Sequence, residues 1–116
     1  MSELKSRTHQ INLVTTALTS TSSSIAWDML TGDNFSHTFT EDTTLANPTN
    51  TTEGKSGFIF LTQHASSPKT LAFDTDFVFS GGTGPTVTAT NSAVDVLQYV
   101  VMPSGDILIT SALNIS

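Results

Sequence analysis

The chain has 116 residues, no cysteine, and ten acidic against four basic side chains, which gives a formal net charge of −6. This length fits one domain, and the negative charge disfavours binding to nucleic acid or to an anionic membrane, because both would repel the protein. A chain without cysteine has neither a disulfide framework nor a thiolate metal site.

Serine and threonine supply most of the polar surface. Charged residues make up 12% of the chain, about half the usual share. Threonine suits strands because it is β-branched and its hydroxyl can pair across a sheet. A hydroxyl-rich surface with little charge is typical of proteins that pack against many copies of themselves.

The first 18 residues are predicted to form an N-terminal arm that ends in the first strand, and residues 19–116 are predicted to form one domain. A solvated tail is the simple interpretation of the arm, and docking on an acidic neighbour is the other, because two of the four basic residues lie here. The residues predicted to make such contacts are Leu4, Lys5, Arg7, His9 and Ile11. The N-terminus lacks a hydrophobic signal-peptide core and no segment is apolar enough to span a membrane, so we expect synthesis in a cytosol.

Trp27 is the only tryptophan, and a turn is expected after it at residues 31–34. We interpret it as an anchor, either in the core or at a contact between subunits, and it is the sixth predicted interaction residue. A platform that stacks on a sugar is the alternative.

The segment 34–40 alternates Phe35, His37 and Phe39 with small polar residues, which predicts a half-buried strand. His37 is interpreted as a satisfied or edge-exposed histidine rather than a catalytic base, because no orienting carboxylate has a matching position. His9 and His64 lie in other segments, so we expect no three-histidine metal site.

Two segments, 56–63 and 93–102, are apolar enough to predict strongly buried strands, with both faces of the second at least partly covered. Shorter strands are expected at 43–46 and 69–73. A glycine-rich turn at 81–85 should lead into a further strand at 86–90 with one solvent-exposed face. It is not a phosphate loop, because a proline follows it instead of Lys-Ser/Thr and a helix.

A hairpin turn at 103–106 should join the strand 93–102 to a final antiparallel strand at 107–113. Asp95 interrupts the apolar strand, so it lies either on the wetter face or against backbone donors of a neighbouring loop. The fold class that follows is all-β, a single antiparallel β-sandwich or jelly-roll-like domain with an extended N-terminal arm.

No catalytic residue, cofactor or metal ligand is predicted, and we do not expect an enzyme. The chain has no Gly-x-Ser-x-Gly elbow and no thiol nucleophile. Asp74 and Asp76 invite a calcium interpretation, but calcium takes six or more oxygens, so a solvated turn is favoured.

Five segments in order, 43–50, 54–63, 69–73, 79–88 and 91–99, resemble a small β-domain that recurs in tailed-bacteriophage virion proteins. The most specific part is Gly-Gly-Thr-x-Pro at 81–85, followed by Asn-x-Ala-Val-Asp-Val-Leu at 91–97. The resemblance implies a virion component built from repeated copies, with no catalytic residues, and a homotrimer.

A domain of this size without a shaft resembles capsid decoration, or cement, proteins. The implied partners are the major capsid protein or other virion proteins and further copies of the chain, and the implied location is the virion, after synthesis in the host bacterial cytoplasm. The alternative is a tail or head-fibre tip that binds host glycans, with Trp27, Tyr99 and polar loop residues as its sugar site.

Overall fold

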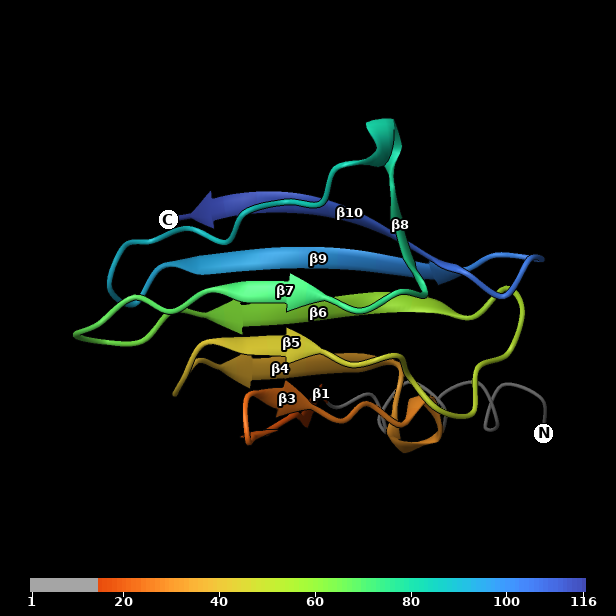
Figure 1. The fold of residues 1–116 in the computed structure, drawn as a ribbon, viewed down its shortest axis with the longest axis horizontal. Coiled ribbons are helices and arrows are strands. Elements are labelled where there is room, and N and C mark those ends of the chain that lie inside the picture. Colours follow the sequence, from red (N-terminus) through yellow and green to blue (C-terminus); the bar gives the residue numbers. More distant parts are fainter. Residues whose placement is uncertain (1–14) are drawn as a thin grey trace, which may run out of the picture.

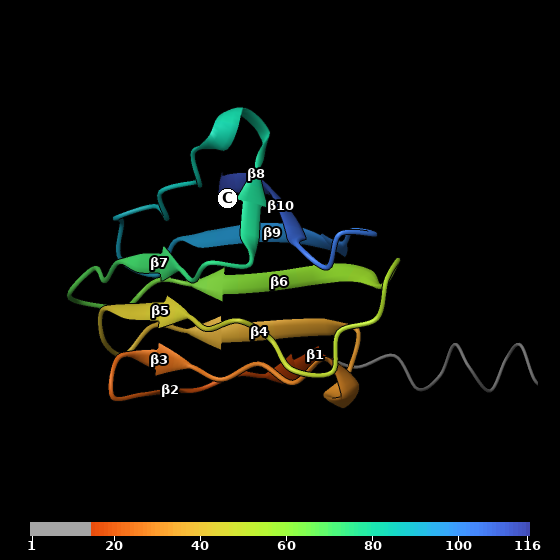
Figure 2. The ribbon, with the colours of Figure 1, turned by 45° about the vertical axis from the view of Figure 1, so that its right-hand side comes forward.

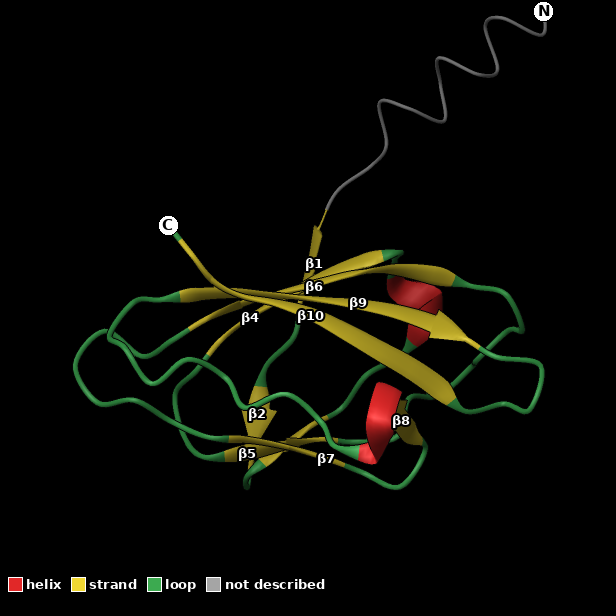
Figure 3. Ribbon diagram, turned by 90° about the horizontal axis from the view of Figure 1, so that it is seen from above, coloured by secondary structure: helices red, strands yellow, loops and turns green. Residues whose placement is uncertain are grey.

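The computed structural model describes residues 15–116, which form two β-sheets stacked as two layers (Figure 3). Sheet A contains, in spatial order, β1 (Thr15–Ala17), β4 (Asn34–Thr38), β6 (Ser56–Thr62), β9 (Val94–Val101), β10 (Ile107–Ile115) and β8 (Phe77–Phe79). Sheet B contains β2 (Ser20–Thr21), β3 (Ser24–Ile25), β5 (Thr43–Leu45) and β7 (Leu71–Phe73). The predicted all-β class is confirmed.

Two short 3₁₀ helices complete the elements, η1 (Met29–Thr31) and η2 (Ser80–Gly82). No helix in the described part of the chain is long and apolar enough to cross a membrane.

From β1 to β7 the chain passes back and forth between the two sheets (Figures 1 and 2). Strands β4 and β6 lie in sheet A, while β5 and β7, the strands that follow each of them, lie in sheet B. Apart from the antiparallel β2–β3 pair, neighbours in this part of each sheet are separated in the chain by strands of the other sheet, which act as the crossover that a parallel pair requires. The pairs β1–β4, β4–β6, β3–β5 and β5–β7 are all parallel.

The expected purely antiparallel arrangement is thus wrong, because both sheets are mixed: β2–β3 is antiparallel, whereas the four pairs above and β8–β10 are parallel. It is right for the centre of sheet A, where β9 pairs antiparallel with both β6 and β10. The predicted hairpin between β9 and β10 is confirmed. Its last strand is longer than predicted, and its register shifts after Ala112, near Asn114, which has a φ of +54°.

The core lies between the layers and is centred on Trp27. Its ring makes edge contacts with Phe35 at 5.4 Å and Tyr99 at 5.1 Å, and it stacks on Phe77 at 6.0 Å between ring centroids. These partners come from β4, β9 and β8. Because Trp27 is only 2% exposed, its ring serves the core and has no face free for a sugar or for another subunit.

The segment 86–90, predicted as a strand, has no regular structure. Both edges of β9 are already occupied by β6 and β10, so the segment has no ladder to join there. Val87 is nevertheless buried, and Thr88 is held by hydrogen bonds to Asp95. The apolar side chain anchors the segment without strand pairing.

Gly57 in β6 permits a close approach between β6 and the backbone of Asp33. A Cβ atom at this position would lie 1.9 Å from the carbonyl oxygen of Asp33 and 2.9 Å from the Tyr99 hydroxyl. The Asp33 oxygen belongs to the backbone, so it cannot move aside as a flexible side chain could.

We therefore predict that Gly57→Ala lowers the free energy of unfolding by about 1–3 kcal/mol, the usual cost of forcing extra volume into a packed site. Urea unfolding followed by tryptophan fluorescence measures the change. Ser56→Ala, on the exposed neighbour, is the matched control. Equal unfolding midpoints for the two variants would contradict the prediction.

Candidate functional site

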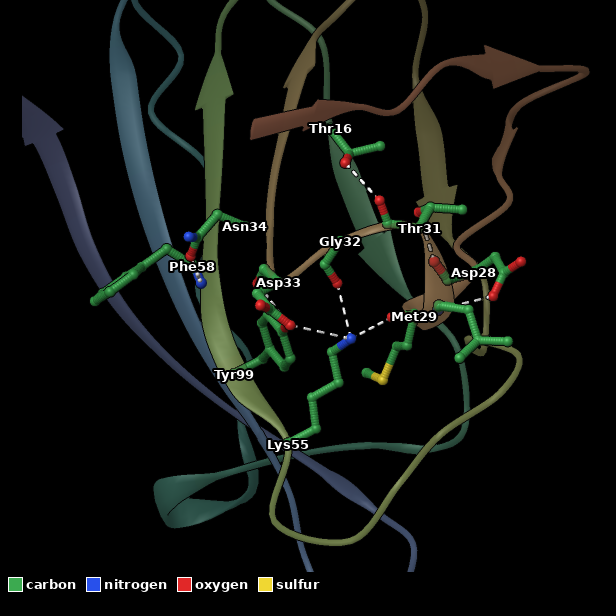
Figure 4. Close-up of polar contacts among 11 residues, drawn as sticks. Thr16, Asp28, Met29, Thr31, Gly32, Asp33, Asn34, Lys55, Phe58 and Tyr99 are labelled. Atoms are coloured by element: carbon green, nitrogen blue, oxygen red, sulfur yellow. Dashed lines mark hydrogen bonds and ion pairs between the residues drawn. The ribbon is translucent and has the colours of Figure 1, made fainter. Parts of the chain in front are cut away.

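A cluster of polar contacts lies where the η1 loop meets the start of β6 (Figure 4). The Lys55 ammonium donates to the carbonyl oxygens of Met29 and Gly32, the latter at 2.8 Å, and lies 3.4 Å from the Asp33 carboxylate. An ammonium group has three N–H donors, and these three contacts account for them. Lys55 therefore ties the loop to the sheet and has no donor left for a ligand.

Asp28 begins the η1 helix and is held in the same way. Its carboxylate accepts hydrogen bonds from the Asn50 amide at 2.8 Å and from the Leu30 backbone N–H at 3.0 Å. These two bonds, first that of Asn50, lower the pKa of Asp28 below its ordinary value, with a smaller contribution from the charge of Lys55. The carboxylate is thus a helix cap rather than an acid-base group.

Tyr99 connects this cluster to the core. Its hydroxyl donates to the backbone carbonyl of Asp33 at 2.6 Å, and the side chain is fully buried. Burial, and secondly the negative charge of Asp33, raise the pKa of Tyr99 to about 12.

Asp95 is buried on the inner side of β9 and accepts three hydrogen bonds. They come from the backbone N–H and the hydroxyl of Thr88 and from the backbone N–H of Asn114, each at 2.7 Å. Of the two alternatives for Asp95, bonding to backbone donors of a neighbouring segment is therefore confirmed. The carboxylate holds both the irregular segment 86–90 and the shifted end of β10.

His37 lies beside a hollow of about 330 Å³ between β4 and the corner where β1 leads to β2. Its Nδ1 is 2.8 Å from the carbonyl oxygen of Leu18, and since a carbonyl only accepts, this nitrogen carries the proton. Nε2 is buried and has no partner among the described residues. His37 is thus half-satisfied, and its one hydrogen bond is to a backbone carbonyl rather than to the carboxylate that would orient a catalytic base.

Asp74 and Asp76 lie in the turn predicted for them. The Asp74 carboxylate accepts from the backbone N–H groups of Thr75 at 2.8 Å and Asn47 at 3.3 Å. Within residues 15–116, no three His, Asp or Glu side chains are grouped so as to hold a metal ion.

The outer face of sheet A, turned away from sheet B, has a different character. Among the described strands only β9 contains a charged residue, Asp95, and it points inward. Because strand residues alternate between faces, the outer face carries only uncharged side chains: Asn34, Ser36, Thr38, Ser56, Phe58, Phe60, Thr62, Val94, Val96, Gln98, Val100, Leu108, Thr110 and Ala112.

Two phenylalanines project from this face. Phe58 and Phe60 are 41% and 39% exposed, and their rings stack at 6.2 Å, so we call them the Phe58–Phe60 ridge. The Phe58 ring lies on the opposite side of β6 from Tyr99 (Figure 4). The strong burial predicted for 56–63 is therefore right for Ile59 and Leu61 and wrong for the two phenylalanines.

Two shallow hollows lie beside the ridge over β9 and β10, and we call them the β9–β10 hollows. One, of about 230 Å³, is lined by residues that include Gln98, Val100, Leu108 and Thr110. The other, of about 130 Å³, lies between Phe58, Val96, Gln98 and Ala112. Ridge and hollows together form the candidate interaction surface.

The residues predicted to make contacts are placed as follows. Leu4, Lys5, Arg7, His9 and Ile11 lie outside the described residues. In the remainder of the 1–18 segment, β1 pairs with β4 at the edge of sheet A and Leu18 is buried in the core. Sequence reasoning missed the sheet face, although the lack of charge in every outward strand position could have indicated it.

Comparison of the chain with models of protein families, with curated proteins and with solved structures finds no match. The resemblance to a bacteriophage virion domain stays a prediction that depends on the motifs quoted above.

We predict that Tyr99 titrates near pH 12 in the folded protein and near pH 10 when unfolded. Because the folded pKa is the higher one, folding favours the neutral phenol, and its stabilisation is complete below pH 10 and lost as the pH rises toward 12. Tyr99 is the only tyrosine, so tyrosinate absorbance reports on it alone. Asp33→Asn should move the midpoint down only slightly, because burial is the larger cause. A native midpoint near 10 would contradict the prediction.

We predict that Asp95→Asn lowers the free energy of unfolding by about 1–3 kcal/mol, because the new NH₂ group faces donors where the carboxylate accepted. Amide hydrogen exchange should accelerate at Thr88 and Asn114, the two backbone groups that Asp95 holds. Glu53→Gln, which removes the same charge from an exposed loop residue, is the control. Unchanged exchange at both amides would count against this role of Asp95.

Proposed function

We propose that this chain is a structural subunit that packs side by side with copies of itself and with neighbouring proteins, as a capsid decoration protein of a tailed bacteriophage. The observation that carries the proposal is the uncharged outer face of sheet A with its exposed ridge, Phe58 and Phe60. Soluble proteins usually intersperse charged side chains over their exposed surface, and an uncharged face with exposed aromatic rings is typical of an interaction site. None of the described strands has an outward charge.

The charges that are present support lateral packing. Apart from Asp95, every charged residue of the described part lies in a loop or turn, as Asp28, Asp42, Asp74 and Asp106 do. Loops join the strand ends, so the negative charge gathers at the ends of the strands and the sheet face stays neutral. We also propose that the two layers are a β-sandwich, with mixed rather than antiparallel sheets.

The assignment to a virion rests on the resemblance of residues 43–99 to bacteriophage β-domains. On this proposal the partners are the major capsid protein or other virion proteins, the chain itself forms a homotrimer, and the virion is its location after synthesis in the host cytoplasm. Binding energy spread over several subunits would stabilise the shell, since opening it breaks many contacts at once. No catalytic role is part of the proposal.

The alternative, a fibre tip that binds host glycans, has less support. Both rings considered for its sugar site, Trp27 and Tyr99, are buried in the core. A glycan site on this chain would have to use Phe58 and Phe60 instead. Screening the protein on a glycan array tests this alternative directly.

We expect the purified protein to co-sediment with phage shells that lack it and to raise the temperature at which those shells open. Shells that already carry a full complement are the control, because their sites are occupied. If the protein neither co-sediments with these shells nor raises their heat resistance, the proposal is contradicted.

The number of copies per virion, measured by quantitative mass spectrometry against the major capsid protein, locates the chain. A ratio near one to one, or one trimer per local three-fold axis, is expected for a decoration protein. A few to a few tens of copies would instead favour the tail, neck or fibres.

A further inference from the structure

We propose that the outer face of sheet A is the interface between copies of this chain, with the Phe58–Phe60 ridge of one copy seated in the β9–β10 hollows of a second. The inference rests on the proposed function in one respect, that the chain works as an assembly subunit. It does not require the virion, and it names the surface and the partner.

The shape of the face carries the first step. Across the sheet, Phe58 pairs with Gln98 and Phe60 with Val96, and on the next strand Gln98 pairs with Thr110. Projecting rings on β6 therefore stand directly beside the smaller side chains of β9 and β10. When two such faces meet, each ridge lies over the hollows of the other copy, so the surface is complementary to itself.

The volumes agree with this arrangement. The hollows measure about 130 and 230 Å³, and a protein cavity of about 150 Å³ holds one benzene ring. By this measure the larger hollow has room for one phenylalanine ring, and the smaller one admits part of a ring. A contact in which each face covers the other is two-fold symmetric and pairs two copies. The homotrimer proposed above would need a second contact outside this face.

Charge favours a second copy over other occupants. A basic partner such as a cationic peptide would find no carboxylate on this face, and the −6 charge of the chain disfavours a nucleic acid. An identical face brings no charge to be buried, which avoids the main penalty of burying polar surface. Gln98 and Thr110 remain available for hydrogen bonds across the interface.

The area sets the strength of the contact. Strands β4, β6, β9 and β10, at about 4.8 Å spacing and about seven residues of 3.3 Å each, give roughly 400–450 Å² of flat face per copy. Two faces then bury roughly 800–900 Å², just below the ~1,000 Å² at which specific interfaces begin. We therefore expect association that depends on concentration and becomes firm where copies are held side by side.

The test is sedimentation velocity of the full chain over a range of concentrations. We expect the unaltered protein to shift from monomer to a larger species and Phe58→Asp to remain monomeric, because its carboxylate would be buried against the partner. Phe58 is 41% exposed, so circular dichroism should be unchanged. Thr51→Asp adds the same charge on an exposed loop and should associate normally.

A second variant and a mixing experiment make the test independent of Phe58 alone. Thr110→Asp places the charge in the hollow and should also give a monomer. Tagged Phe58→Asp should retain untagged Gln98→Lys, because the introduced carboxylate of one copy then meets the introduced ammonium group of the other. The same tagged variant should not retain untagged Phe58→Asp, since two carboxylates would then face uncharged side chains.

An unaltered protein that is monomeric at every concentration would overturn the inference. If Phe58→Asp then also melted at a lower temperature than the unaltered monomer, the face would be covered by another segment of the same chain. Association by Phe58→Asp equal to that of the unaltered protein would also overturn it. Self-association without shell binding would contradict the virion proposal alone, whereas shell binding by a strictly monomeric chain would contradict this interface alone.

Discussion

Burial of Trp27 between the two sheets is the interaction on which the rest of the structure depends. The four strands of sheet B have only two or three residues each, too few for the sheet to be stable by its own hydrogen bonds. Trp27 reaches from the end of β3 to Phe35, Phe77 and Tyr99 on three strands of sheet A. Burying a ring of this size contributes roughly 5 kcal/mol. The tryptophan therefore joins a marginal sheet to a strong one.

The buried and partly buried polar groups hold the loops around this core in place. Lys55 binds the carbonyls of the η1 loop, Tyr99 binds Asp33, and Asp95 holds Thr88 and the end of β10. Each of these groups would be a candidate for chemistry if it faced a cleft with an unused lone pair or proton. Here their bonds go mostly to backbone atoms of the same chain, and they position loops rather than ligands.

The sequence located most strands because alternation and β-branched residues report local burial, as in β4 and β10. It did not reveal which strands pair, because passage between two layers depends on contacts such as Trp27 with Phe77, far apart in the chain. The exposed ridge was missed for a related reason. The run from Phe58 to Leu61 is apolar at every position, so no alternation of polar and apolar residues indicates which face of the strand is buried.

The lack of charge on the outer face has a consequence for how copies could meet. Interspersed surface charges normally oppose association of a face, whereas here the described carboxylates outside the core lie in loops, as Asp42 and Asp106 do. Beyond about 8 Å at physiological salt such charges are screened, so they act mainly on approaches that bring loop ends together. They do not oppose face-to-face approach over Phe58 and Phe60. Repulsion at the loops and apolar contact on the sheet thus select the same orientation.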